Sequence, residues 1–233
     1  MKRATLDKAP GDIAAMFDQV SLKYDITNFV LTFGLIDVWR VATREAIAPR
    51  PGMKILDIAA GTGASSATYA KEGADVVASD ISEGMMATGR KRHPHLNFVQ
   101  ADATDLPFAD NTFDVTTVSY GLRNVNDPDK ALREMLRVTK PGGKLVVAEF
   151  SRPTFAPFRR AYRLFLAEVL PMVAFFVSSD AVAYDYLVES ILSWPRQEVF
   201  AQRIQGAGWR EVEYRNLSNG IVALHRATKP AEN

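Results

Sequence analysis

The sequence predicts a doubly wound α/β fold, in which a mostly parallel, seven-stranded sheet carries an antiparallel edge and a helical lid. The first observation is the stretch Lys54–Ala64, KILDIAAGTGA, where a short apolar strand runs into a turn with two glycines before a helix. The second is the alternation of strand-like and helix-like segments downstream, which is typical of parallel sheets covered on both faces. The third is a pair of final strands around Ser218-Asn219-Gly220, which predicts the antiparallel edge.

The pattern of apolar residues predicts helices in the N-terminal fifth of the chain. Apolar residues from Ile13 to Val20 recur at helical spacing, and Ile26–Ile47 is apolar with few charges. Pro49-Arg-Pro51-Gly52 separates this part from the first strand. We therefore predict an N-terminal helical cap over residues 1–50 that roofs a pocket.

Residues 51–150 form the predicted cofactor-binding core of a single domain. After the first strand, helix-compatible residues run from Ser65 to Lys71, and Ser82 and Asp127 are good caps for two further helices. Beyond the core we expect a helical insert over residues 151–193 and a helix from Pro195 within a C-terminal part, residues 194–233. The later strands are expected at Asp75–Asp80, Leu96–Ala101, Phe113–Ser119, Lys144–Phe150, Trp209–Asn216 and Gly220–Ala227.

The composition narrows the class of protein. The chain has 233 residues, a net charge of +1 and no cysteine, so disulfides and thiolate metal sites are excluded. Basic residues form no run, so nucleic acid is not an expected partner. No charged-then-apolar leader opens the sequence, and the apolar stretch Leu166–Val177 is shorter than the roughly 20 residues that span a bilayer. We expect a cytoplasmic protein.

The glycine turn with Gly61 and Gly63 allows a ligand to approach bare backbone. A dinucleotide site is one reading, but Ser66 replaces the third glycine of that motif and nearby positive charge is lacking. The carboxylate of Asp57, four residues before the turn, would repel a pyrophosphate and suits the α-amino cation of S-adenosylmethionine. The turn therefore favours S-adenosylmethionine as the cofactor.

Two more acids follow successive strands. Asp80 closes the second strand, where a carboxylate can accept both ribose hydroxyls, and Asp102 follows the third, where it can meet the adenine amine. Taken singly, each is also a common turn former or helix cap. Ligands of open α/β sheets bind at the carboxyl edge of the strands, so together these acids support the same cofactor site.

Several motifs resemble, over nearly the whole chain, the quinone-biosynthesis C-methyltransferases. This family has the class I, S-adenosylmethionine-dependent fold and methylates demethylmenaquinone or a polyprenyl methoxybenzoquinol. The motifs are Lys23-Tyr-Asp25 with Asn28, Phe33-Gly34, Leu56–Gly63, Gly121-Leu-Arg-Asn-Val125, Arg137–Gly143, Glu149-Phe150 with Pro153, Glu189-Ser-Ile191 and Asn216–His225.

Position by position, the resemblance implies that Thr62, Asp80, Asp102, Ala103 and Ser119 contact the cofactor. The pattern is closer to the menaquinone branch, which implies methylation of demethylmenaquinol to menaquinol. Two alternatives stay open: a benzoquinol acceptor of the ubiquinone branch, and a scaffold subunit that binds the cofactor without catalysis.

Methyl transfer to a ring carbon needs alignment of the reactants and help for the phenolic proton of a reduced quinol. Arg123 is the leading candidate to stabilise the phenolate or steer the proton, and an ion pair that fixes its loop is the alternative. Asn124 could orient the ring or form a turn. Tyr24 and Asp25 belong to the segment that roofs the pocket, where they would contact substrate or simply pack.

His225 has the intrinsic pKa of a base, although a lone histidine on a strand is more often structural. His93 and His95 flank a proline at a helix end, and we expect no metal site there.

The stretch Phe155–Val177 is rich in apolar residues and edged by Arg159, Arg160 and Arg163. A polyprenyl tail needs an apolar channel, and basic residues beside apolar ones favour transient contact with an anionic membrane surface. A core helix or a homodimer face would give the same pattern, so these alternatives stay open.

Overall fold

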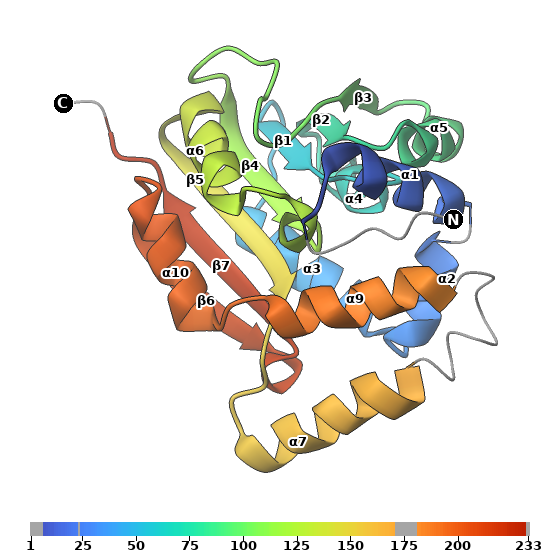
Figure 1. The fold of residues 1–233 in the computed structure, drawn as a ribbon. Coiled ribbons are helices and arrows are strands. Elements are labelled where there is room, and N and C mark those ends of the chain that lie inside the picture. Colours follow the sequence, from blue (N-terminus) through green and yellow to red (C-terminus); the bar gives the residue numbers. More distant parts are fainter. Residues whose placement is uncertain (1–6, 23, 171–180, 232–233) are drawn as a thin grey trace.

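In the computed structural model, residues 7–22, 24–170 and 181–231 are described. Seven strands form one sheet in the order β3-β2-β1-β4-β5-β7-β6. Strands β1 to β5 are parallel, and β7 lies antiparallel between β5 and β6. The predicted fold class is therefore confirmed (Figure 1). The strands are β1 (Lys54–Ile58), β2 (Asp75–Asp80), β3 (Asn97–Gln100), β4 (Phe113–Ser119), β5 (Thr139–Phe150), β6 (Arg210–Leu217) and β7 (Val222–Thr228).

Helices cover both faces of the sheet. One core joins α6 and α10 to the sheet, and a second joins α3 and α4 to the opposite face. The helices are α1 (Pro10–Val20), α2 (Tyr24–Leu31), α3 (Leu35–Ile47), α4 (Ala64–Lys71), α5 (Glu83–Arg92), α6 (Pro128–Val138), α7 (Ala156–Leu164), α9 (Ala181–Ser193) and α10 (Gln197–Gly206). Short helical turns are η1 (Leu122–Asn124), η2 (Phe165–Val169) and η3 (Ser218–Gly220).

Helix α6 shows how the sequence builds one of these cores. Its buried side chains recur at helical spacing, so a single apolar stripe faces the sheet. Asp127 caps its first turn, as predicted, because its carboxylate accepts a hydrogen bond from the Lys130 N–H at 2.9 Å. Ser82 caps α5 in the same way by accepting from the Met85 N–H at 3.1 Å.

Several expected elements have different limits in the structure, and the last two strands are displaced by one or two residues. The third strand is shorter than Leu96–Ala101. The fifth strand begins at Thr139, which pairs with Phe113, and regular pairing resumes at Lys144. Pro141-Gly142-Gly143 therefore lies inside this strand, where the register with β4 shifts. The segment Ile26–Ile47 forms two helices, because Gly34 takes a left-handed conformation with φ +77° between them.

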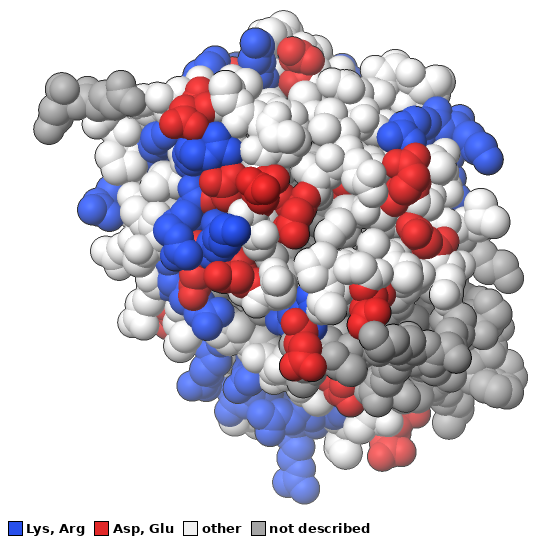
Figure 2. All heavy atoms as spheres, turned by 45° about the horizontal axis from the view of Figure 1, so that its top comes forward, with Lys and Arg blue, Asp and Glu red and all other residues white. Residues whose placement is uncertain are grey.

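The expected insert over 151–193 forms α7, η2 and α9, and its residues 171–180 lie outside the described residues. Figure 1 shows α7 and α9 beyond the carboxyl ends of β4 and β5, on the side where α2 also lies. Among the described residues, no single helix is both long and apolar enough to cross a membrane; α2 and α3 pass that test only as a pair, and they are bent by 102°. Acidic and basic side chains are interspersed over the face drawn in Figure 2.

Candidate active site

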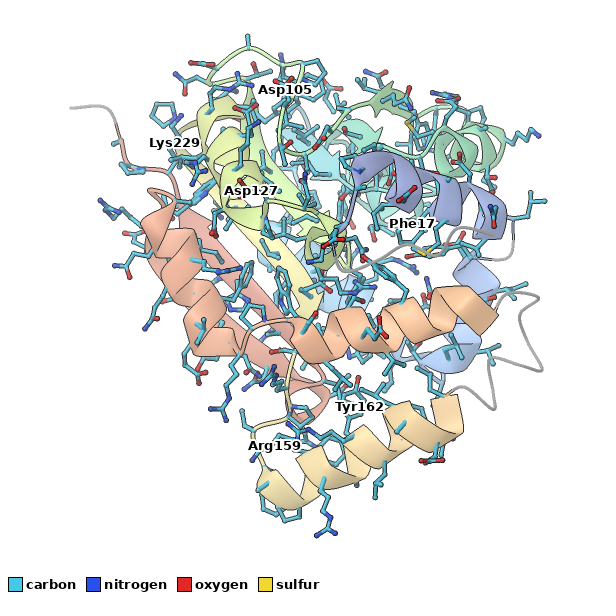
Figure 3. All side chains as sticks on the ribbon, viewed as in Figure 1. Phe17, Asp105, Asp127, Arg159, Tyr162 and Lys229 are labelled. Atoms are coloured by element: carbon cyan, nitrogen blue, oxygen red, sulfur yellow. The ribbon has the colours of Figure 1, made fainter. Side chains whose placement is uncertain are left out.

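A cavity of about 910 Å³ lies at the carboxyl edge of the sheet, a size typical of sites for small molecules. The loops after β1, β2, β3 and β4 form its floor, and α1, α2, α3, α7, η2 and α9 contribute to the other walls. Phe17 of α1 and Tyr162 of α7 both line it, and Figure 3 shows Tyr162 directed from α7 toward α9. The strand order reverses between β1 and β4, so the cavity occupies the switch point of the fold.

Asp80 ties two of these loops together. One of its carboxylate oxygens accepts from the Gly61 N–H at 2.7 Å and the other from the Ser82 N–H at 2.9 Å. Gly61 has a left-handed φ of +59°, which favours glycine. Burial raises the pKa of Asp80, while these backbone donors stabilise its charged form. Asp80 and Gly61 both line the cavity, as the sequence predicted.

The next predicted positions also line the cavity. Asp102 follows β3, and its carboxylate accepts from both the N–H and the hydroxyl of Thr104, at 2.8 and 2.9 Å. Ala103 lies beside it on the cavity wall. Ser119 ends β4, and its buried hydroxyl has no hydrogen-bond partner among the described residues. Two carboxylate acceptors, Asp80 and Asp102, and one hydroxyl donor, Ser119, therefore line the half of the cavity formed by the loops after β1 to β4.

The N-terminal cap is fastened to this half by two carboxylates. Asp25 of α2 accepts from the Thr62 hydroxyl at 2.8 Å and pairs with Arg92. Asp18 of α1 accepts from the Ser82 hydroxyl at 2.5 Å and from the Gly84 N–H at 2.8 Å. Both Thr62, in the loop after β1, and Asp25, in the N-terminal cap, line the cavity, so the cap lies against the floor at this point.

Two predicted cofactor residues, Asp57 and Gly63, do not line the cavity. Asp57 is 1% exposed, and its carboxylate accepts from the Ser66 hydroxyl at 2.6 Å. It therefore holds the start of α4 and does not face the cavity. Gly63 is also outside the lining; a Cβ there would lie 2.7 Å from the ring of Phe98, so its role is close packing. The expectation that Asp57 meets an amino cation directly is not supported by this geometry.

Arg123 lies in the loop after β4 and lines the cavity while 4% exposed. The Arg123 guanidinium pairs with Glu149 of β5 at 2.9 Å, and the backbone N–H of Arg123 donates to the same carboxylate at 3.1 Å. It also donates to the Tyr120 carbonyl and lies 5.1 Å from the centre of the Phe150 ring. The ion pair that the sequence offered as an alternative is thus present, yet Nε is buried without a partner among the described residues.

Asn124 and Tyr24 occupy the space around Arg123. The Asn124 side-chain oxygen accepts from the Tyr186 hydroxyl at 3.2 Å, and this bond joins the loop after β4 to α9. Burial raises the pKa of Tyr24, so its phenol is held in the donor form. Both residues line the cavity.

His225 does not belong to this cavity. It is 2% exposed on β7, its Nε2 lies 3.1 Å from the Gln197 carbonyl, and its ring packs on Phe200 and Tyr214. Burial lowers its pKa to about 4. The structural alternative therefore holds for His225. Within the described part of the chain, no group of three or more His, Cys, Asp or Glu side chains could hold a metal ion.

The sequence analysis assigned no role in the site to three polar side chains. Glu149 partners Arg123, and its signals were its place in the Glu149-Phe150 motif of the resemblance and an acid at the end of an otherwise apolar strand. Tyr120 lines the cavity with φ +59° and a buried hydroxyl that has no partner among the described residues. Arg40 of α3 also lines it, and its signal was a cation within the apolar segment Ile26–Ile47.

Comparisons with known proteins give this geometry a context. The model of the ubiE/COQ5 methyltransferase family matches residues 4–229. A demethylmenaquinone methyltransferase of Renibacterium salmoninarum is 58% identical over 229 residues, which cover 98% of this chain and 97% of that protein. One of Mycobacterium bovis is 53% identical over 232 residues, covering 100% and 98% of the two chains.

Solved structures share the fold at low sequence identity. A SAM-dependent methyltransferase of Thermotoga maritima superposes with a TM-score of 0.66 at 20% identity, covering 92% of this chain and 99% of that one. Phosphoethanolamine N-methyltransferase 2 of Haemonchus contortus, in complex with S-adenosyl-L-methionine, gives 0.61 at 17% identity, covering 82% and 52%.

The buried Asp57 makes stability depend on pH. Burial raises its pKa from 3.8 to about 7, so between these values the folded chain binds more protons than the unfolded chain. Its contribution to the free energy of unfolding is fully present below about pH 4 and is lost as pH rises through about 7. We expect urea unfolding from about pH 5 to 8 to show a flatter profile for Asp57→Asn than for the native sequence.

Asp75 provides the matched control, because it is an exposed carboxylate at the start of β2. Asp75→Asn should keep the native pH profile. Parallel profiles for the native chain and Asp57→Asn would contradict a raised pKa at Asp57.

Proposed function

Because the chain belongs to the ubiE/COQ5 methyltransferase family, we propose that it transfers the methyl group of S-adenosylmethionine to a ring carbon of demethylmenaquinol, forming menaquinol. The observation that carries the proposal is a single cavity with two unlike halves. Polar groups on the loops after β1 to β4 line one half, and aromatic and aliphatic side chains of η2, α9 and the N-terminal cap line the other. Relatives named demethylmenaquinone methyltransferase, more than 50% identical over nearly their whole length, support the choice of acceptor.

The polar half fits S-adenosylmethionine by its donor and acceptor set. The Asp80 carboxylate suits the ribose hydroxyls, Asp102 and Ala103 suit the adenine, and the unpartnered Ser119 hydroxyl supplies a further polar contact. Gly61 and Thr62 bring backbone close to the ligand. When bound, this cofactor supplies a methyl group already activated on a sulfonium, so the protein has mainly to align the reactants and exclude water.

Arg123 is placed to stabilise the quinol as its hydroxyl loses a proton. The ion pair with Glu149 and the bond to the Tyr120 carbonyl hold the guanidinium in one orientation. Its Nε donor remains for an oxygen of the ring. A preorganised cation of this kind acts on negative charge as it develops, without reorganising during the reaction.

The residues around Arg123 orient the acceptor ring. Tyr24 presents a protonated phenol, and the Asn124 amide is fixed by its bond to Tyr186. The apolar wall formed by Phe150, Tyr162 and its neighbours suits the fused ring and the start of a polyprenyl tail. Asp25 contributes by holding the roof on Thr62.

Transfer of labelled methyl from S-adenosylmethionine to chemically reduced demethylmenaquinone tests the proposal, with a demethylated benzoquinol assayed beside it. We expect label on the naphthoquinol. Arg123→Lys keeps the charge but not the planar fork, so kcat should fall about 10²-fold while binding of S-adenosylhomocysteine is retained. Arg133→Lys, on the exposed face of α6, is the matched control and should react normally.

Other outcomes of this assay point elsewhere. Label on the benzoquinol alone would move the protein to the ubiquinone branch. A lack of label on either quinol, despite measurable cofactor binding, would contradict the proposed function and favour a scaffold role.

The polar half of the cavity can be tested by calorimetry alone. Asp80→Asn should weaken binding of S-adenosylhomocysteine by about tenfold to a hundredfold, because bonds to a charged acceptor contribute about 1.5–3 kcal/mol. Asp75→Asn, at the opposite end of the same strand, should bind as the native chain does. Equal affinities for all three proteins would remove Asp80 from the cofactor site.

We also propose that α7 brings the protein to an anionic membrane surface, where a polyprenylated acceptor resides. Arg160 and Arg163 are exposed on α7, and Phe155 and Leu164 are 65% and 58% exposed beside them. Apolar and basic side chains on one short helix suit the interface between water and lipid. Arg159 is less available, because it donates to the Pro153 and Thr154 carbonyls.

Co-sedimentation with phosphatidylglycerol vesicles tests this contact. The double variant Arg160→Ala/Arg163→Ala should bind about thirtyfold more weakly, since each of the two basic side chains near such a surface contributes about 1 kcal/mol. Arg210→Ala/Arg215→Ala removes two exposed arginines from β6 and serves as the control. Equal losses in the two double variants would mean that binding reflects net charge and not α7.

A further inference from the structure

Arg40 is a cation on the cavity wall that the proposed reaction does not use. It lies on α3, one residue after the buried Trp39, and its side chain is 24% exposed. Its only hydrogen bond among the described residues is from Nη1 to Asp37, at 2.5 Å. Asp37 is 56% exposed, and an ion pair with a partner so exposed adds little stability. The pair therefore does not account for a cation placed at the cavity.

The Nε donor of Arg40 is buried and has no partner among the described residues. Four of the residues that line the cavity carry a buried polar atom in this state: Arg40, Ser119, Tyr120 and Arg123. Buried donors are rarely left unpaired in folded proteins, so a group of them around one cavity points to a ligand with matching acceptors.

The charge of Arg40 is felt by residues near the carboxyl ends of β1 and β4, the two strands between which the strand order reverses. Burial raises the pKa of Asp57, near the end of β1, and of Tyr120, just after β4, and the charge of Arg40 opposes this rise at both. Arg40 is therefore a cation near the carboxyl ends of β1 and β4, on the cavity that occupies the switch point.

The charges around the cavity show which cation can pair with an anionic group of a ligand. Asp25, Asp80 and Asp102 line the cavity and would repel an anionic ligand group. Of the described cations that line it, Arg123 is paired with Glu149, and Lys8 lies near that same pair. Arg40 is the remaining one.

We propose that Arg40 binds the α-carboxylate of the methionyl part of S-adenosylmethionine. Arginine suits this task because its planar fork of donors matches the two oxygens of a carboxylate and stays charged when partly buried. The neighbouring acids then serve the ribose and the adenine, and Arg40 supplies the opposite charge at the other end of the cofactor. The inference rests on the cofactor of the proposed function.

Calorimetry with two ligands tests this role without turnover. S-adenosylhomocysteine carries the carboxylate, and its decarboxylated analogue lacks only that group. For the native chain we expect the analogue to bind about tenfold to a hundredfold more weakly. Arg40→Met keeps the apolar stem and should lose the same factor for S-adenosylhomocysteine, while its affinity for the analogue should stay within about twofold of native.

Two more variants separate charge from structure. Asp37→Asn breaks the surface ion pair but leaves Arg40 in place, so it should discriminate between the two ligands as the native chain does. Arg40→Lys should recover part of the preference for the carboxylate, because a point charge replaces the fork. Thermal unfolding of each variant without ligand reports whether the fold is retained.

Equal weakening of both ligands by Arg40→Met would overturn the proposal, and so would an unchanged affinity for S-adenosylhomocysteine. Failure of the native chain to bind S-adenosylhomocysteine at all would instead contradict the cofactor assignment and the proposed function with it. The two failures are therefore distinguishable.

Discussion

One carboxylate fixes the distance between the loops on which the cavity depends. Asp80 accepts from the Gly61 N–H and from the Ser82 N–H, so the turns after β1 and β2 share one acceptor. A glycine turn has wide conformational freedom of its own, and this side chain removes much of it. The Ser82 hydroxyl then donates to Asp18 of α1, so the position of the N-terminal cap follows from the same point.

Much of this edge could be predicted because parallel strands bring their carboxyl ends together. Asp80, Asp102 and Ser119 each close or follow a strand, and the structure places all three on the cavity. Asp57 was predicted to join them and does not, because it lies within β1 and its side chain turns toward Ser66 of α4. The sequence predicted the strand that contains Asp57, but the direction of its carboxylate depends on how α4 packs against that strand.

The remaining differences concern contacts between elements distant in sequence. His225 is buried because α10 packs across β7 and brings Phe200 onto its ring, which no local pattern around the histidine reveals. Arg40 reaches the cavity because of how α3 is set against β1 and β4. Hydrophobic spacing gives the buried stripe of a helix, but not its position along the sheet, so a polar side chain at the margin of that stripe is difficult to assign.

Helix α2 touches both halves of the cavity. Through Asp25 it is bonded to Thr62 beside the glycine turn, and through Leu31 it packs with Leu166 and Ile191 in the apolar part. Because α2 contributes to both halves, a substitution that shifts this helix would change the contacts of both at once. The two halves of the cavity therefore share one wall, and neither can be redesigned independently of the other.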